Sequence, residues 1–259
     1  TMKRCLNSNN QSNNDKICKP IEFQIIDWRS YSAENENGEK NYTIRIFGRT
    51  RENETIHVKV NNFQPHFYVE IPSEWKIEHI RYMIQYVRNK VKPQENVNGL
   101  VDNNLLIPKK KHRFWGFTNH KEFPFLKLRF SDYSSMKSYE NVFLKPMRIF
   151  RISQQPFMLQ VYESNIDPII RCMHRRNLNS VGWVRLTNYK NIPPIDDVEE
   201  TLAEINVSTR WDKLNRLENN MITKLKIASF DIECTSEDGK FPQACRDGDK
   251  IIQIGTTFS

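Results

Sequence analysis

The sequence is poor in cysteine and contains no paired cysteine motif. Its 259 residues include five cysteines, none of them in a C-x-x-C pair. They are spread along the chain: Cys5, Cys18, Cys172, Cys234 and Cys245. This distribution does not fit a disulfide framework, so we expect reduced thiols in an intracellular compartment. Cys172 and His174 would face different directions on a helix, which argues against a zinc site there.

Long apolar runs and a signal peptide are also absent. No apolar stretch approaches the ~20 residues that span a bilayer, and we expect no membrane partner. The composition, 38% hydrophobic and 27% charged, is instead that of a globular chain. Its length suffices for one large domain or for two ordinary ones.

Positive charge, in contrast, is in excess. The chain carries 39 Lys and Arg against 31 Asp and Glu, a formal net charge of +8. This balance favours a polyanionic partner such as nucleic acid, through Coulomb attraction and the release of counterions. The alternative is a solvated basic surface without a specific partner.

One basic run, "PKKKHRFWGF", adjoins aromatic rings. Its candidate nucleic-acid contacts are Lys109, Lys110, Lys111 and Arg113, and its rings are Phe114, Trp115 and Phe117. Such a run suits a single strand, because phosphates meet cations and bases stack on rings. The alternative is a charged loop that enters a strand. We interpret the rings as core residues and leave both interpretations open for the lysines.

The expected elements begin after a tail. Residues 1–19 are rich in Asn and Ser without periodicity, which predicts a disordered segment. Alternating apolar residues then predict strands at 21–28, 42–50 and 55–63, the last two joined as a hairpin by a short polar turn. In the last strand Ile56, Val58 and Val60 share one face, and we expect the opposite face to be wet.

Helical periodicity follows in residues 74–91. Apolar residues recur there at spacings of three and four: Ile77, Ile80, Ile84, Val87 and Val91. Ser73 is the expected N-cap of this helix. Further helices are expected at about 132–143 and from Pro168 to Arg176, the latter with Asp167 as N-cap. Helices thus alternate with strands through residues 20–186, which predicts a layered α/β or α+β domain rather than a β-sandwich.

The periodicity weakens in residues 187–223, which include Pro193 and Pro194. We predict an inter-domain linker there and a new domain at 224–259.

That last segment contains a pair of acids, Asp231 and Glu233, in the run "IASFDIECTS". In a strand they would share one face, about 6–7 Å apart, while Phe230 and Ile232 face the core. Two such carboxylates suit a pair of Mg²⁺ or Mn²⁺ ions that cleave a phosphodiester. D-x-E alone is expected about once by chance in such a chain, and two ligands cannot hold two ions. Asp247 and Asp249 are interpreted as loop acids.

The wider string "IASFDIECTSEDGKFPQACRDGDKIIQIGTTFS" resembles the opening of the 3′–5′ exonuclease domain in family B DNA polymerases, the delta-type group in particular. Three elements stand at the family's spacing: S-F-D-I-E-C at 229–234, G-x-F-P at 239–242 and I-Q-I at 252–254. Upstream, "FGRTRENETIHVKVNNFQPHFYVEIP" and "YESNIDPIIRCMHRRNLNSVGWVRL" resemble N-terminal segments of the family, with Asn62 and His66 as departures. The resemblance covers roughly residues 20–259.

This resemblance implies an α+β fold. An N-terminal, template-side domain (20–186) would contain an RNA-binding-like βαβ core, and 224–259 would form the first hairpin of an RNase H-like exonuclease fold. By the same analogy Asp231 ligates both metal ions, and Glu233 ligates one ion plus the attacking water. The family often has D-P where this chain has "DGDK", so neither Asp247 nor Asp249 is assigned a role.

Other family motifs are not found in this chain, namely the later exonuclease motifs and the palm motifs D-x-x-S-L-Y-P and Y-G-D-T-D-S. We therefore expect an N-terminal fragment of a replicative DNA polymerase with proofreading, from a eukaryote or a large DNA virus. It would work in the nucleus or at a cytoplasmic viral replication site. Alone, the fragment should be inactive and hold no ordered metal.

The implied partners are DNA (template, primer and a single-stranded end), dNTP in the complete enzyme, and a sliding clamp or other replication factors. The alternative function is a non-catalytic module that binds single-stranded nucleic acid, with F-D-I-E as a vestige. A third alternative is a scaffold role, which requires that none of these motifs takes part in binding or catalysis.

Overall fold

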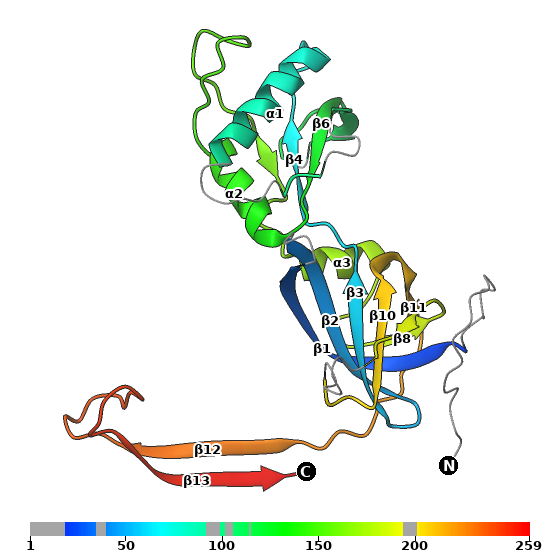
Figure 1. Ribbon diagram of the computed structural model, residues 1–259, viewed down its shortest axis with the longest axis vertical. Helices are drawn as coiled ribbons and strands as arrows, with labels where there is room; N and C mark the ends of the chain where they lie inside the picture. Colours follow the sequence, from blue (N-terminus) through cyan, green and yellow to red (C-terminus); the bar gives the residue numbers. More distant parts are fainter. Residues whose placement is uncertain (1–18, 35–39, 92–98, 102–105, 114, 194–200) are drawn as a thin grey trace. The chain divides into compact units, whose positions relative to one another are not determined.

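The computed structural model describes residues 19–34, 40–91, 99–101, 106–113, 115–193 and 201–259. The predicted tail, apart from Lys19, lies outside the described residues, as does Phe114. The chain forms two compact units, Thr1–Asn220 and Met221–Ser259. The first unit contains two sheets, each with its own core (Figure 1). Helices accompany both cores, so the fold is mixed α+β, as predicted.

The first sheet has seven strands in the order β11-β8-β1-β2-β3-β10-β9. Their bounds are β1 Ile21–Glu34, β2 Lys40–Thr50, β3 Thr55–Asn61, β8 Trp183–Leu186, β9 Lys190–Asn191, β10 Ile205–Arg210 and β11 Leu214–Leu217. Strands β2 and β3 form the predicted antiparallel hairpin. The core beneath them is aliphatic because Ile44, Ile46 and Val58 are fully buried, together with Phe23 of β1.

Helix α3 (Pro168–Arg176) lies at one end of this sheet and contributes the buried Cys172 (Figure 1). Both of its ends follow from the sequence. The Asp167 side chain accepts a hydrogen bond from Ile169 N (2.7 Å), and Pro168 occupies the first helical position. Asn177 ends the helix in the left-handed region, with φ of 52°.

The prediction of a linker at 187–223 was wrong for most of its described part. Strands β9, β10 and β11 and a short 3-10 helix, η1 (Trp211–Lys213), all lie within it. Strand β10 pairs in parallel with β3, and the Glu204 carboxylate accepts a hydrogen bond from Thr55 N (2.6 Å). Such short strands carry little periodicity, and their partners are distant in sequence. Pro194, which belongs to the predicted linker, lies outside the described residues.

The prediction of a wet face on β3 also fails at one position. His57 is fully buried, stacks on the Phe47 ring (5.1 Å between centroids) and lies 3.1 Å from Asn206 Oδ1 through its Nδ1 atom. Asn206 belongs to β10. Strand β10, which the sequence did not predict, therefore covers the His57 side chain.

The second sheet has the order β5-β6-β4-β7. Its strands are β4 His66–Glu70, β5 Lys109–His112, β6 Glu122–Arg129 and β7 Val161–Tyr162. The chain order is β4-α1-β5-β6-α2-β7, in which α1 spans Ile77–Val91 and α2 spans Tyr133–Phe143. Both helices pack on one face of this sheet, over Phe67, Leu126 and Leu128 (Figure 1).

The predicted apolar stripe of α1 is buried, except at its first residue. Ile80, Ile84, Val87 and Val91 lie in the core, whereas Ile77 is 52% exposed. Ser73 lies four residues before the helix, so its prediction as the N-cap was wrong. Helix α2 lies within the predicted range of about 132–143, and its N-cap is Asp132, whose side chain accepts a hydrogen bond from Ser135 N (3.0 Å).

The second unit is an antiparallel hairpin of β12 (Ala228–Thr235) and β13 (Lys250–Phe258). All of β13 is exposed, and Phe230 and Ile232, which we expected in a core, are 74% and 45% exposed. The reason is that, in the part of the chain described, β12 and β13 pair only with each other. Over the described ranges, no helix is long and apolar enough to cross a membrane.

Candidate functional site

Asp231 and Glu233 lie on one face of β12. Asp231 is opposite Gly255 of β13, and Glu233 is opposite Gln253. The pairing is regular from Ala228 to Glu233, and a bulge follows only after Glu233. Because side chains alternate along a regular strand, the two carboxylates project from the same face, as the spacing predicted. Both residues are exposed.

The donor chemistry of this pair fits Mg²⁺ or Mn²⁺, but the number of donors is too small. Carboxylate oxygens are the ligands that these ions prefer. Within the described ranges, no three His, Cys, Asp or Glu side chains come together in a group that could hold a metal ion. The pair could therefore supply part of a metal site that needs further carboxylates.

The two loop acids between β12 and β13 differ in their surroundings. Asp249 Oδ2 accepts a hydrogen bond from Gln243 N (2.7 Å) and lies 3.0 Å from Arg246 Nε. Arg246 Nη1 also donates to Asp238 (2.7 Å). Hydrogen bonds from Ser236 and from the backbone of Lys240 lower the pKa of Asp238 below its ordinary value. Asp249 is thus engaged in holding the loop, whereas Asp247 is exposed.

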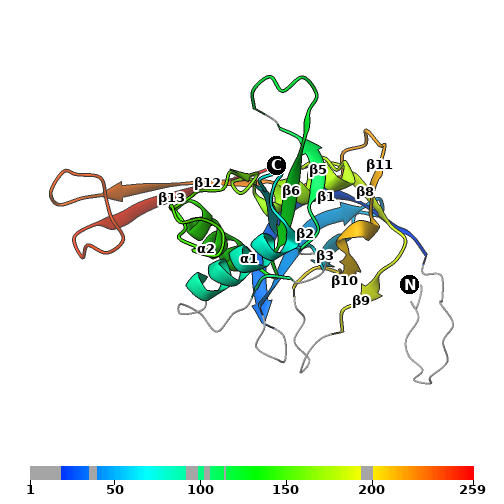
Figure 2. The same ribbon diagram turned by 90° about the horizontal axis from the view of Figure 1, so that it is seen from above.

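The basic run forms an exposed edge strand and not a buried one. Lys109, Lys110 and Lys111 lie in β5, whose four residues are all exposed. Our interpretation of the rings as core residues was wrong for the two that the structure describes: Trp115 is 74% exposed and Phe117 is 94% exposed. They belong to the connection between β5 and β6, which extends away from the sheet (Figure 2).

Arg113 folds back onto the second sheet. Its Nε donates to Glu70 Oε2 (2.9 Å), and its guanidinium lies 3.8 Å from the centroid of the Phe123 ring. Tyr162 Oη donates to the same Glu70 oxygen (2.9 Å). The hydrogen bond from Arg113 is the main reason why the pKa of Glu70 lies below its ordinary value.

Sequence reasoning missed Tyr68 and Lys127, which lie opposite each other on β4 and β6. Lys111 Nζ is 4.2 Å from the centroid of the Tyr68 ring, and Lys127 Nζ is 5.9 Å from it. The available signal was the alternation in "FLKLRF". Leu126 and Leu128 enter the core, so Lys127 and Arg129 must face the other way.

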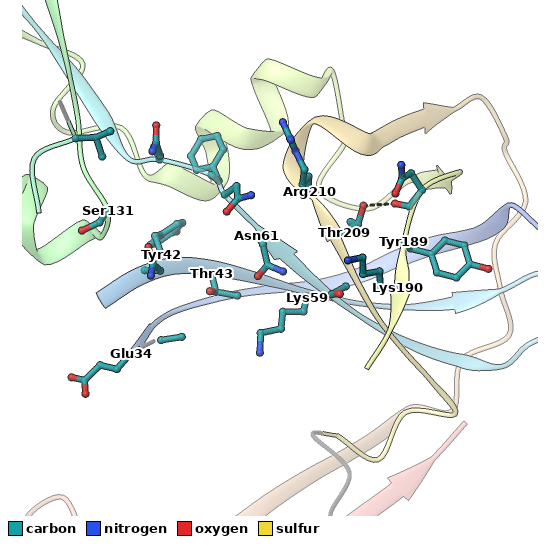
Figure 3. A pocket seen from close by; sticks show the side chains of 18 residues that line it. Glu34, Tyr42, Thr43, Lys59, Asn61, Ser131, Tyr189, Lys190, Thr209 and Arg210 are labelled. Carbon is teal, nitrogen blue, oxygen red and sulfur yellow. Dashed lines mark hydrogen bonds between the residues drawn. The ribbon is translucent and has the colours of Figure 1, made fainter. Parts of the chain in front are cut away.

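A polar cavity of about 670 Å³ lies in the first unit, and neither Tyr68 nor Lys127 lines it (Figure 3). Its lining includes Tyr42 and Thr43 of β2, Lys59 of β3 and Arg210 of β10. Thr209 Oγ1, also in the lining, donates a hydrogen bond to the Asn188 carbonyl (2.7 Å). None of the site residues predicted from the sequence lines this cavity.

Comparison with known proteins shows what the chain is similar to. Residues 159–259 match the family model described as DNA polymerase family B, exonuclease domain, and this range contains Asp231 and Glu233. The chain is also similar in structure to the family B DNA polymerase from the archaeon Pyrobaculum calidifontis, with a TM-score of 0.61. That match covers 92% of this chain and 26% of the archaeal chain at 15% identity, so it shows the fold alone. The chain is homologous to a segment of the family B DNA polymerases.

The chain is also similar in sequence to viral and delta-type DNA polymerases. It is 37% identical to a DNA polymerase of Acanthamoeba polyphaga mimivirus over 249 residues, which is 93% of this chain and 14% of that protein. It is 25% identical over 217 residues to a DNA polymerase delta catalytic subunit of Dictyostelium discoideum, covering 82% of this chain and 19% of that protein. The chain therefore spans less than a fifth of either relative. The resemblance to viral and delta-type polymerases is confirmed.

Proposed function

We propose that this chain is part of a DNA-directed DNA polymerase with a proofreading 3′–5′ exonuclease, and that Asp231 and Glu233 are two of the metal ligands of the exonuclease. The observation that carries this proposal is the shared face of the two carboxylates on β12, inside the region that matches the family's exonuclease domain. In the whole polymerase, the site would act on the single-stranded end of a primer.

The chain's own residues would position the donors. A strand fixes the spacing of the two carboxylates, and Ile232 N donates a hydrogen bond to Asp231 Oδ1 (2.9 Å), which orients that carboxylate. Mg²⁺ or Mn²⁺, when bound, would activate the attacking water and stabilise the leaving oxygen of the phosphodiester. Because two carboxylates do not complete such a site, we propose that the 259-residue chain alone has neither polymerase nor exonuclease activity.

We also propose a division of the chain, with a template-side domain followed by the start of the exonuclease domain near residue 224. The chain order β4-α1-β5-β6-α2-β7 and the strand order β5-β6-β4-β7 support an RNA-binding-like core in the first part. The boundary after Asn220 between the compact units supports the second part. The involvement of dNTP, a sliding clamp and a nuclear or viral replication site stays a prediction for the whole polymerase.

The test is a pair of substitutions in the polymerase that contains this chain. Asp231→Ala with Glu233→Ala should lower Mg²⁺-dependent degradation of a 3′-labelled single-stranded oligonucleotide by about 100-fold or more, since the lost interactions are worth several kcal/mol in the transition state. Primer extension should be retained. Asp247→Ala, in the exposed part of the same hairpin, is the matched control and should leave degradation unchanged.

Two results would contradict the proposal. Full exonuclease activity in the double variant would remove Asp231 and Glu233 from the site. Mg²⁺-dependent degradation by the purified 259-residue chain, abolished by Asp231→Ala, would show that the chain needs no further ligands. A non-catalytic binding module, the alternative function, predicts no exonuclease activity in any longer protein that contains the chain.

A further inference from the structure

The second sheet has one face that neither α1 nor α2 covers, which we call the open face; Arg171 of α3 contacts it at His66, which is buried. Leu126, Leu128 and Phe67 point to the helices, so the alternate residues of each strand point the other way. On the open face, the partly exposed aromatic residues are Tyr68, Phe123 and Tyr162, whereas Phe125 is buried against Tyr162 (5.2 Å between ring centroids). The cationic residues of this face are Lys109, Lys111, Lys127 and Arg129. Aromatic and cationic side chains thus alternate across adjacent strands.

Tyr68 is at the centre of this arrangement. Lys111 of β5 and Lys127 of β6 both direct their ammonium groups at its ring, at 4.2 Å and 5.9 Å from the centroid. Phe123 has a cation on its ring in the same way, with Lys121 Nζ at 5.6 Å in addition to the Arg113 guanidinium. Tyr68 and Phe123 are both half-buried, which holds their rings in place. A base stacks on Tyr68 when the flexible Lys111 side chain moves from the ring to a phosphate of the ligand.

Positive charge around Tyr68 exceeds the negative charge that faces it. Arg171 and Arg175 of α3 join Lys111, Lys127 and Arg129 in the surrounding field. Two acids lie nearby, and both are engaged: Glu163 with Arg171 (2.5 Å), and Glu70 with Arg113 (2.9 Å). Burial, together with these neighbouring cations, lowers the pKa of Lys127 to about 8. An anion placed beside Lys127 would relieve this repulsion.

The aromatic rings and the excess of positive charge on the open face together fit one class of ligand. Cations spaced over stacking rings are what a single strand requires, because its phosphates need positive charge and its unpaired bases need flat surfaces. A duplex would offer the phosphates but not the exposed base faces. The exposed Trp115 and Phe117, in the loop between β5 and β6, extend the aromatic surface beyond the edge strand.

We propose that the open face binds single-stranded DNA, with a base stacked on Tyr68 and with Lys111 and Lys127 in contact with the adjacent phosphates. The choice of DNA rests on the proposed function, whereas the stacking and the charge rest on the sheet alone. The proposed contacts are made by Tyr68, Lys111 and Lys127, so binding requires no metal ion.

The experiment measures binding of a fluorescently labelled thymidine oligonucleotide of about 12 nucleotides to the 259-residue chain in the presence of EDTA. Tyr68→Leu should weaken binding by about five- to 150-fold, the fold-change that corresponds to the ~1–3 kcal/mol contributed by one stacked base. Lys111→Ala with Lys127→Ala should reduce the slope of log affinity against log salt by about 1.4, or about 0.7 per phosphate contact. Glu70→Gln, which removes a negative charge from the open face, should strengthen binding about two- to threefold.

Lys90→Ala is the matched control. Lys90 Nζ also lies over a tyrosine ring, at 5.6 Å from the centroid of Tyr86, but on α1 and thus on the covered side of the sheet. Its loss should leave both the affinity and the salt slope unchanged. Circular dichroism checks that each variant is folded. If Tyr68→Leu does not fold, photo-crosslinking of an iododeoxyuridine oligonucleotide to the unmodified chain should label the peptide that contains Tyr68.

Three results would overturn the inference: equal affinity in the sheet variants and in Lys90→Ala, tighter binding of duplex than of single strands, or crosslinks that map outside the open face. Tighter binding of RNA than of DNA would overturn the choice of ligand. Since the assay contains no divalent metal and involves no cleavage, its failure leaves the exonuclease test of the proposed function intact.

Discussion

His66 connects β4 to α3 through a buried and neutral ring. Its Nδ1 lies 2.9 Å from the Gln64 carbonyl oxygen, and Arg171 Nη1 lies 3.2 Å from its Nε2. Because a guanidinium only donates, Nε2 accepts and the proton is on Nδ1, which donates to Gln64. Burial, with further repulsion from Lys127, Arg171 and Arg175, lowers the pKa of His66 to about 3.

This depressed pKa makes folding sensitive to acid. The unfolded chain binds a proton at His66 near pH 6.5, whereas the folded chain does not until about pH 3. The contribution of His66 is therefore fully present above pH 6.5 and is lost as the pH falls from 6.5 toward 3, by up to about 1.4 kcal/mol per pH unit. We expect His66→Phe to unfold in urea with a shallower dependence on pH between 6.5 and 5 than the unmodified chain.

His112→Phe is the control for this measurement, because His112 is exposed on β5. It should keep a steeper dependence on pH than His66→Phe, since His66 is still present in it. Equal slopes in His66→Phe and in the unmodified chain would show that His66 is protonated alike in the folded and unfolded states.

At the scale of the element, α2 depends on one buried carboxylate. Asp132 accepts hydrogen bonds from Ser135 N (3.0 Å), Ser135 Oγ (2.5 Å) and Ser134 Oγ (2.7 Å), and it is fully buried. Asp132→Ala should lower the free energy of unfolding by about 2 kcal/mol, the upper end for an N-cap, because the Ser135 groups lose their partner in a dry site. Denaturant unfolding measures this change.

Asp212→Ala is the control for the cap. Asp212 is paired with Arg210 (3.0 Å) at the surface, and such exposed pairs contribute between zero and about 1 kcal/mol. A loss in Asp132→Ala no larger than that in Asp212→Ala would mean that α2 begins without its cap.

The elements that the sequence predicted well are those set by local signals. The three helices follow from 3.6-residue periodicity and from caps such as Asp167, and the β2–β3 hairpin follows from alternation around a short turn. Strand β10 could not be found in this way, because its parallel partner β3 is far away in the sequence. The burial of His57 by Asn206 is a consequence of that pairing.

In the candidate site, too, the features set by local signals were predictable and those set by long-range strand pairing were not. A period of two places Asp231 and Glu233 on one face, and the register confirms it. The exposure of Trp115 and Phe117 was not predictable from their type, since large rings are more often buried and only the path of the β5–β6 connection decides otherwise. Tyr68 and Lys127 meet only because β4 and β6 pair in one particular register.

At the scale of the whole molecule, the hairpin of the second unit has two distinct faces. Asp231 and Glu233 occupy one face, and exposed apolar side chains, including Phe230, Ile232 and Ile254, occupy the other. A two-stranded hairpin is marginally stable by itself, and an uncovered apolar face favours association with another chain. The second unit therefore has the properties of a sheet fragment, whereas the first unit has two complete cores.

We accordingly expect a chain shortened to residues 1–220 to unfold thermally within about 2 °C of the 259-residue chain, because the two compact units each hold their own contacts. In the longer chain, the backbone amides of Ile232 and Ile254 should exchange with deuterium rapidly, while those of the buried Ile44 and Ile46 stay protected.

The longer chain should also self-associate at lower concentration, and Phe230→Ser with Ile254→Ser should reverse this without changing the melting temperature. A drop of more than about 5 °C on shortening would instead show that residues 221–259 contribute to the stability of the first unit.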